Sequence, residues 1–160
     1  MIIRNALPTD YPSIISVLND WWGGRNMSNM LPRLFFIHFQ ETSFITEEDG
    51  RIIGFLIGFL SQTYPNEAYI HFVGVHPDYR KKGVGKKLYK HFFEVARNHD
   101  RNIVRCVTAP INQGSIAFHT RMGFQIETPK IMIEGAAYSP DYDGASEHRV
   151  QFIKKLISEG

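Results

Sequence analysis

The stretch from residue 68 to residue 90 reads Ala68-Tyr-Ile-His-Phe-Val-Gly-Val-His-Pro-Asp-Tyr-Arg80-Lys-Lys-Gly83-Val-Gly85-Lys-Lys-Leu-Tyr-Lys90. It predicts an apolar strand, then a basic turn with two glycines, then a helix. Glycines let a turn expose consecutive backbone N–H groups, and a helix N-terminus adds the positive end of its dipole. Five cationic side chains crowd the same turn: Arg80, Lys81, Lys82, Lys86 and Lys87. The turn is therefore predicted to bind an anion such as a pyrophosphate.

The spacing of the glycines excludes two common phosphate-binding motifs. A nucleotide-triphosphate loop ends Gly-Lys-Ser/Thr, whereas Lys87 follows Gly85-Lys86 and offers no hydroxyl for a magnesium ion. A dinucleotide-binding fingerprint needs a third glycine at position 88, which is Leu88. What remains is Arg80-x-x-Gly83-x-Gly85 after a strand that ends Val73-Gly74-Val75-His76-Pro77.

This remaining pattern resembles the acyl-CoA-binding signature of the GNAT superfamily of N-acetyltransferases, Arg/Gln-x-x-Gly-x-Gly/Ala. A second stretch is similar to the later motif of that superfamily: Asn112-Gln-Gly-Ser115-Ile-Ala-Phe118-His119-Thr-Arg-Met-Gly123-Phe124. On these two motifs the chain is identified as a member. The resemblance implies acetyl-CoA as the acyl donor and one N-acetyltransferase domain over residues 1–160.

Composition narrows the class of protein further. The chain has 43% hydrophobic and 21% charged residues, which is ordinary for a globular domain. No apolar run approaches the roughly 20 residues that cross a bilayer, and no secretory signal follows Met1, so we expect a cytoplasmic protein without a membrane span. The net charge of +2 argues against a general nucleic-acid surface. With Cys106 as the only cysteine, neither an internal disulfide nor a metal site is expected.

Hydrophobic periodicity and turn residues predict elements in the order βααβββαβαββ. A first helix is expected after a cap at Pro8-Thr9-Asp10, with an apolar face at Ile14, Ile15, Val17 and Leu18. A second is expected over residues 31–40, and two more begin at Val84 and in the Asn112 motif. The predicted strands cover residues 2–3, 43–46, 51–60, 68–75, 102–108 and 149–156.

The resemblance implies an α/β (α+β) fold with a mixed, mostly antiparallel sheet of six to seven strands and flanking helices. Strands four and five splay apart, and acyl-CoA lies in the wedge, with its pantetheine arm paired to the free backbone of strand four. Main-chain contacts would come from Val73 and Val75, and the backbone of residues 80–86 would cradle the pyrophosphate. The implied donor-binding residues are Val73, Gly74, Val75, Arg80, Lys81, Lys82, Gly83, Val84, Gly85, Lys86, Asn112 and Ser115.

His119 is the candidate general acid. Many family members place a tyrosine there, which protonates the departing CoA thiolate, and phosphinothricin-type acetyltransferases resemble this chain in having a histidine. An imidazole is well matched to proton transfer near neutral pH. A histidine held for packing or for orienting the cofactor is the alternative.

The candidate base lies on the fourth strand. With period two, Glu67, Tyr69 and His71 share one face, opposite Ile70 and Phe72. His71 is the first choice, and Tyr69 occupies the position of a glutamate that many relatives use. A half-exposed strand histidine without a role, or proton transfer through water, remains an alternative for His71.

The acceptor site is predicted from two loops. The loop between the first two helices holds Trp21, Trp22 and Arg25, which suit an amine that carries a carboxylate, although adjacent tryptophans also commonly seal a core. The late loop holds Tyr138 and Asp141, together with Tyr142 and Asp143, whose acidic and phenolic groups suit an ammonium group. Turn chemistry alone also explains the aspartates.

Three functions follow from these observations. The first is an N-acetyltransferase that acts on a primary amine of a small molecule or amino-acid derivative. The second is the same chemistry on a protein N-terminus or lysine, which needs an open groove in place of an aromatic pocket. The third is an acyl-CoA-binding regulatory module without catalysis. The expected partners are acetyl-CoA and an amine, with neither nucleic acid nor membrane, and a homodimer is expected by analogy with the superfamily.

Overall fold

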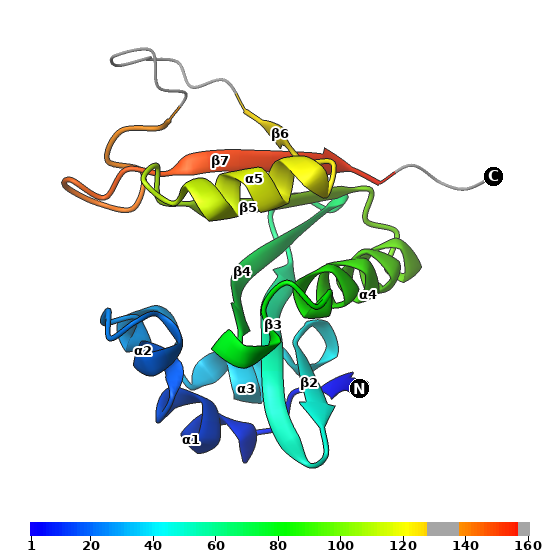
Figure 1. Cartoon of the computed structure of the whole chain (residues 1–160). Helices are drawn as coiled ribbons and strands as arrows, with labels where there is room; N and C mark the ends of the chain where they lie inside the picture. The colour runs from blue at the N-terminus through cyan, green and yellow to red at the C-terminus, as the bar shows by residue number, and fades with distance from the viewer. Residues whose placement is uncertain (128–137, 157–160) are drawn as a thin grey trace.

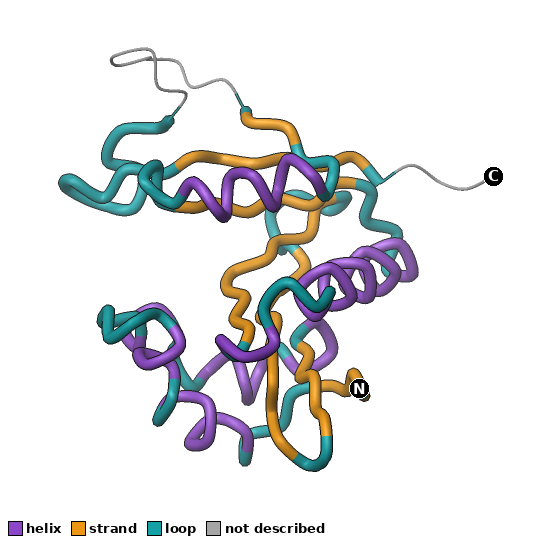
Figure 2. The backbone as a smooth tube through the Cα atoms, in the orientation of Figure 1, coloured by secondary structure: helices purple, strands orange, loops and turns teal. Residues whose placement is uncertain are grey.

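The computed structural model describes residues 1–127 and 138–156, which form a seven-stranded sheet of order β1-β2-β3-β4-β5-β7-β6 with flanking helices (Figure 1, Figure 2). Neighbouring strands are antiparallel except β4 and β5, which are parallel. The strands are β1 (Ile2–Asn5), β2 (Phe44–Glu48), β3 (Arg51–Leu60), β4 (Glu67–Val75), β5 (Ile103–Thr108), β6 (Gln125–Ile126) and β7 (Val150–Lys155). The predicted mixed, mostly antiparallel sheet of six to seven strands is confirmed.

The helices divide between two hydrophobic cores. The residues of α1 (Asp10–Ile15), α2 (Leu18–Trp21) and α3 (Leu34–His38) enter one core, and those of α4 (Val84–Asn98) and α5 (Gln113–Arg121) enter the other. The short 3-10 turns are η1 (Ser28–Met30), η2 (Gln40–Thr42) and η3 (Pro77–Tyr79). In the described ranges, none of the helices has the length and apolar character needed to span a bilayer.

The N-terminal helices are shorter than predicted. The single helix expected through Leu18 is divided into α1 and α2. The Ser16 hydroxyl donates to Ser13 O (2.9 Å), and Val17 N–H donates to Ile14 O (3.1 Å), three residues back rather than four. Serine side chains compete with the helical backbone in this way, and β-branched valine restricts helix propagation. The helix expected over residues 31–40 is reduced to α3 between two 3-10 turns.

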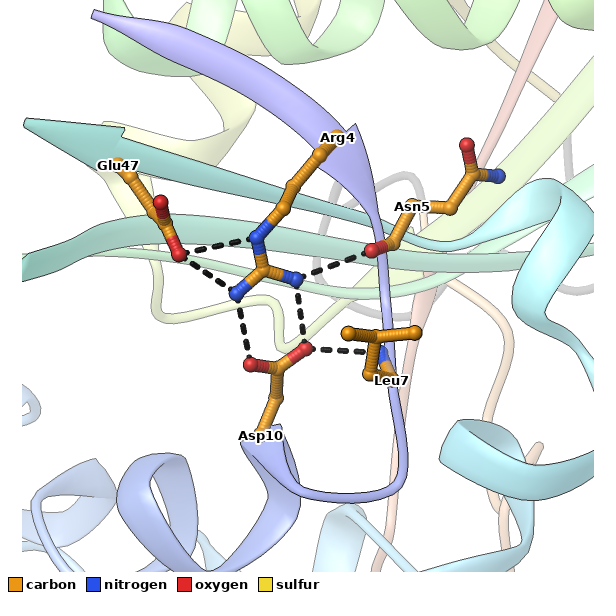
Figure 3. A network of polar contacts seen from close by, with 5 residues as sticks. All are labelled: Arg4, Asn5, Leu7, Asp10 and Glu47. Carbon is orange, nitrogen blue, oxygen red and sulfur yellow. Dashed lines mark hydrogen bonds and ion pairs between the residues drawn. The ribbon is translucent and has the colours of Figure 1, made fainter. Parts of the chain in front are cut away.

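An ion-pair network ties β1 to β2 and to the start of α1 (Figure 3). Arg4 donates to both carboxylate oxygens of Asp10 (2.8 Å each) and twice to Glu47 Oε1 (2.6 and 2.9 Å). Asp10 also accepts from Leu7 N–H at 2.8 Å, whereas the expected cap residue Thr9 makes no side-chain bond of this kind. Burial alone would raise the pKa of Asp10, but the bonds from Arg4 and Leu7 outweigh it and lower the pKa.

A bulge in β4 changes which side chains share a face. Gly58 pairs with Ile70, and Ile57 pairs with Phe72, so His71 is an extra residue on β4. Ile70 belongs to the core of α4, whereas Phe72 belongs to the core of α1–α3. The predicted placement of Phe72 opposite His71 is therefore wrong, because one extra residue reverses the side of every later side chain.

Strands β4 and β5 stay paired over a short distance only. Their partners are Glu67 with Ile103, Ala68 with Val104, and Tyr69 with Arg105. Beyond these pairs β4 continues to Val75 beside β3, and β5 continues to Thr108 beside β7 (Figure 1). The predicted splaying of the fourth and fifth strands is confirmed.

Candidate active site

The turn before α4 has the geometry of an anion-binding site. Lys81 and Gly83 adopt left-handed backbone conformations, with φ of +62° and +82°. Because Lys87 N–H donates to Gly83 O (3.0 Å), the N–H groups of residues 84–86 precede the first helical hydrogen bond. These three N–H groups have no hydrogen-bond partner within the described ranges. They are free to bind a negatively charged group at the positive end of α4.

Gly85 leaves space beside this turn. A Cβ at Gly85 would lie 3.5 Å from Phe118 Cζ and 3.9 Å from Val75 Cγ2. The start of α4, the middle of α5 and the end of β4 therefore meet at this glycine. A phosphate that approaches the α4 N-terminus meets bare backbone there rather than a side chain.

The backbone of β4 next to the splay is the second feature of the predicted donor side. His76 N–H donates to Ile53 O (2.8 Å), which identifies a hydrogen-bonded pair of the antiparallel β3–β4 ladder. Because such pairs alternate with non-bonded ones, the backbone groups of Val73 and Val75 point away from β3, toward the side that β5 has left. Arg80 Nε donates to Val75 O at 3.3 Å. The two valine N–H groups have no partner in the part of the chain that the structure describes.

His119 lies in the core between α4, α5 and β7, with 6% of its surface exposed. Its ring stacks on Phe152, with centroids 4.7 Å apart. Nδ1 lies 2.7 Å from Ser115 O and, because a carbonyl oxygen can only accept, Nδ1 carries the proton. Nε2 then accepts a hydrogen bond from the Tyr89 hydroxyl at 2.7 Å. Both ring nitrogens are used inside the protein.

This arrangement bears on the predicted acid. Burial lowers the pKa of His119, with the bond to Ser115 opposing the effect, so the neutral ring dominates near pH 7. The same burial raises the pKa of Tyr89 well above its ordinary value. The one proton of the neutral imidazole points at Ser115 O, and the general-acid role of His119 stays a prediction.

His71 is oriented from two sides. Its Nε2 lies 2.6 Å from Met30 O, and its ring stacks on Phe35 with centroids 4.5 Å apart and planes 13° apart. The carbonyl again fixes the tautomer, because Nε2 must carry the proton that it donates. The lone pair is therefore on Nδ1. Burial lowers the pKa of His71, while the Met30 contact and the charge of Asp143 raise it less.

The other candidates on β4 are engaged or buried. Tyr69 stacks on Phe59 at 5.2 Å, and burial raises the pKa of its hydroxyl. Glu67 accepts from Arg105 Nε at 2.5 Å, so its carboxylate is already paired. Burial also raises the pKa of Cys106, which makes it a poor nucleophile. Within the described ranges no three His, Cys, Asp or Glu side chains gather in a way that could hold a metal ion.

Comparison with known proteins assigns the chain to a family. The model of the acetyltransferase (GNAT) family matches residues 10–124, which include the anion-binding turn, the splay and α5. The chain belongs to the GNAT family. A diaminobutyric acid acetyltransferase of Nocardia farcinica is 32% identical over 123 residues, or 74% of this chain. The chain spans 63% of that relative's length and 40% and 46% of two others.

Solved GNAT structures share the fold. Ard1 from Thermoplasma volcanium superposes with a TM-score of 0.78 at 22% identity and covers 98% of both chains. The protein yncA from Salmonella typhimurium, solved with its cofactor acetyl-CoA, superposes with a TM-score of 0.70 at 19% identity. That structure covers the whole of this chain, and 96% of its own length is matched.

The predicted acceptor residues of this GNAT chain fall into two groups. Trp21 is 5% exposed and stacks on Phe55 at 6.0 Å, so it is part of the core. Trp22 is half-buried against Phe72 at 5.2 Å, and Arg25 is exposed beyond it. A Cβ at Gly74 would lie 2.5 Å from Phe55 Cε1 and 3.0 Å from Trp22 Cη2. Gly74, expected as a donor contact, lets these aromatic rings pack on β4.

The late loop is held together by its own residues. Asp141 Oδ1 accepts from Ser146 N–H (2.7 Å), and Tyr138 packs beside His148 with centroids 5.3 Å apart. Asp143 pairs with Arg149 Nε at 2.7 Å. It is Asp143, rather than Asp141, whose charge acts on both candidate bases of β4. Asp141 and Tyr138 therefore hold the loop that presents Asp143.

The remaining residues that the sequence predicts to bind the acyl donor lie at two helix starts. Asn112 Oδ1 accepts from Ser115 N–H at 3.1 Å and caps α5. Lys81, Lys82 and Lys86 are exposed around the turn before α4.

Sequence reasoning missed three partners that orient the candidate histidines. Tyr89 binds His119, while Met30 O and Phe35 hold His71. A main-chain carbonyl leaves no signal in a sequence, and Tyr89 and Phe35 are indistinguishable there from ordinary core aromatics. The helical spacing of α4, which places Tyr89 one turn after Gly85, was the one signal in the sequence that could have indicated Tyr89.

Proposed function

We propose that the protein is an acetyl-CoA-dependent N-acetyltransferase that moves an acetyl group directly onto a primary amine of a small molecule or amino-acid derivative. The observation that carries the proposal is the splay: β4 leaves β5 after three residue pairs, beside N–H groups at the start of α4 that find no partner among the described residues. Membership of the GNAT family supports the reaction class. The diaminobutyric acid acetyltransferase among its relatives supports an amino-acid-like acceptor.

On the donor side, the anion-binding turn fits the pyrophosphate of acetyl-CoA. Residues 84–86 offer backbone N–H groups, and the exposed lysines around them add positive charge. The N–H groups of Val73 and Val75, which are unpaired within residues 1–127 and 138–156, would face the pantetheine amides. Acetyl-CoA supplies a thioester carbonyl that a neutral amine attacks, and the amide forms as the carbon–sulfur bond breaks.

His71 is the proposed general base. An ammonium group must lose a proton before it attacks, and the Nδ1 lone pair of His71 is available because Met30 O fixes the proton on Nε2. The lowered pKa keeps the ring neutral, and therefore able to accept a proton, at neutral pH. Asp143 lies where its charge favours the imidazolium that forms. In this scheme Asp143 compensates the transferred charge.

His119 is the proposed general acid, and its surroundings set a condition on that role. Nε2 can protonate the CoA thiolate only after it has gained a proton and its contact with the Tyr89 hydroxyl has been exchanged for the sulfur. Turnover of His119→Phe compared with that of Tyr89→Phe tests whether this happens. A cytoplasmic location and a homodimer remain proposals.

The test is release of CoA thiol from acetyl-CoA with a panel of diamino acids, simple amines and peptides. His71→Gln is the informative variant, since the Gln amide can still donate to Met30 O while the Nδ1 lone pair is lost. The exposed residue His38 provides the control His38→Gln. We expect turnover to fall about 10²- to 10⁴-fold in His71→Gln and to be unchanged in His38→Gln.

Two results would count against the proposal. Tight acetyl-CoA binding without turnover on any acceptor would support the regulatory module instead. Faster turnover of peptides than of free amino acids would move the acceptor to the protein class.

A further inference from the structure

Arg80 belongs to the anion-binding turn by sequence, but its side chain points elsewhere. Nε donates to Val75 O at the end of β4, and Nη2 donates to Trp21 O at the end of α2. Among the described residues these two carbonyls are its hydrogen-bond acceptors, and no carboxylate pairs with it. The guanidinium therefore joins the donor turn to an element on the opposite side of β4.

The Trp21 carbonyl depends on this contact. The helix α2 has four residues, and its last N–H donors reach Asn19 O and Asp20 O, not Trp21 O. In the described part of the chain Arg80 is the hydrogen-bond partner of Trp21 O. A cation at the C-terminal end of a helix stabilises such exposed carbonyls. Loss of Arg80 would leave this carbonyl to solvent.

The turn that begins at Trp21 rests directly on β4. Trp22 packs on Phe72, and the missing side chain of Gly74 gives room for both Trp22 and Phe55. Gly74 lies between Val73 and Val75, whose backbone faces the donor side. The Trp21–Trp22 turn and the donor side therefore share one strand and one arginine.

We propose that Arg80 is a positioning residue that couples CoA binding at the anion-binding turn to the ordering of the Trp21–Trp22 turn on the acceptor side. An anion bound to residues 84–86 fixes the preceding turn, which contains Lys81 and Gly83 in left-handed conformations. Fixing that turn fixes the Arg80 backbone, and the guanidinium then holds Trp21 O. The coupling is reciprocal, so an ordered acceptor turn strengthens CoA binding in return. The inference rests on the proposed function, because it takes CoA as the ligand of the turn.

The chain offers a direct reporter of this coupling. Trp21 and Trp22 are its only two tryptophans, so fluorescence excited at 295 nm reports on the Trp21–Trp22 turn alone. The probe is CoA itself, titrated into the full chain, with binding measured independently by calorimetry. Quenching of the tryptophan emission by acrylamide is measured without CoA and at saturation.

Three variants separate the possible causes of a change. Arg80→Gln removes the charge and both of the observed contacts. Arg80→Lys keeps the charge and one donor group. Lys82→Gln removes a charge from the same turn without touching either carbonyl.

In the wild type we expect CoA to reduce the quenching constant. In Arg80→Gln we expect the reduction to be lost although calorimetry still shows CoA binding. Arg80→Lys keeps part of the reduction and covers the case in which Arg80→Gln does not fold, and Lys82→Gln binds CoA more weakly but responds fully at saturation. With an accepted amine in hand, Arg80→Gln should raise the KM for that amine roughly fivefold or more and, by reciprocity, should weaken CoA binding in the presence of that amine by a similar factor.

Three results would overturn the inference. An undiminished response in CoA-saturated Arg80→Gln would show that CoA affects the tryptophans without Arg80. Rising acrylamide quenching in the wild type would show that binding releases the turn rather than ordering it. Absence of CoA binding in calorimetry would overturn the proposed function and the coupling together, which distinguishes that failure from the other two.

Discussion

The hydrogen bond between Tyr89 and His119 can be tested by a double-mutant cycle with phenylalanine at both positions. Tyr89 is 3% exposed and His119 is 6% exposed, so neither polar group can turn to water when its partner is removed. Tyr89→Phe leaves the Nε2 lone pair unsatisfied, and His119→Phe leaves the tyrosine hydroxyl unsatisfied. Each single change should cost roughly 1–3 kcal/mol of the free energy of unfolding.

The double variant behaves differently, because both unsatisfied groups disappear together. Phenylalanine at position 119 can keep the stack on Phe152, and Ser115 O, which the His119 ring also contacts, lies inside a helix. We expect the free energy of unfolding of the double variant to be at least that of the less stable single variant. The coupling energy between the two positions is then about 1–3 kcal/mol.

The assay is urea unfolding followed by circular dichroism, with the free energy extrapolated linearly to water. If the two single effects add up to the effect of the double variant within about 0.5 kcal/mol, the hydrogen bond between Tyr89 and His119 is refuted. Turnover measured on the same variants below their unfolding temperatures decides the chemical role. An acid at position 119 predicts a loss of about 10²- to 10⁴-fold in His119→Phe with Tyr89→Phe largely active, whereas a packing role predicts similar, small losses in both.

Three further predictions follow from the site and the cores. Turnover should fall as the pH drops below the ordinary histidine pKa of about 6.5, because burial lowers the pKa of His71 and protonation of His71 removes the base; a pH–rate profile without this acidic limb in the wild type would contradict it. Gly74→Ala should destabilise the protein by roughly 1–3 kcal/mol in thermal unfolding, since its Cβ would overlap Phe55, whereas Gly85→Ala, with contacts of 3.5 Å or more, should not clash. Asp10→Asn should lower the free energy of unfolding by roughly 1–3 kcal/mol at pH 7. Because the pKa of Asp10 is lowered in the folded state, the wild type should lose the same contribution as the pH falls below about 4 and the carboxylate is protonated. Equal urea midpoints of the two proteins at pH 7 would contradict this.

Much of the fold follows from short patterns. Alternation of apolar residues located the long strands, and the glycines and lysines of residues 80–87 located the start of α4, because a left-handed turn before a helix needs glycine. The division of the first helix was not predictable, since it depends on which carbonyl the Ser16 hydroxyl reaches. Local competition of this kind is decided by packing rather than by sequence propensity.

The candidate site was predictable to a lesser degree. Two-residue periodicity identified His71 but misplaced Phe72, because the bulge between Ile70 and Phe72 breaks the period and Gly58 on the facing strand is only a weak signal of it. His119 was located by its motif, yet its partner Tyr89 lies 30 residues away on another helix. The motif predicts Gly74 as a donor contact, while its packing role depends on Phe55 and Trp22, which meet it only in three dimensions.

The short pairing of β4 with β5 also has a thermodynamic consequence. The sheet consists of two antiparallel blocks, β1–β4 and β5–β7, joined through three residue pairs and the helices around them. A ligand whose amides bridge that junction would bind the native chain and not the unfolded one. By mass action it would add about 2.7 kcal/mol of stability at a hundredfold excess over Kd. The melting temperature of this protein should therefore rise with CoA concentration, and melting curves would serve as a screen for acyl donors that needs no acceptor.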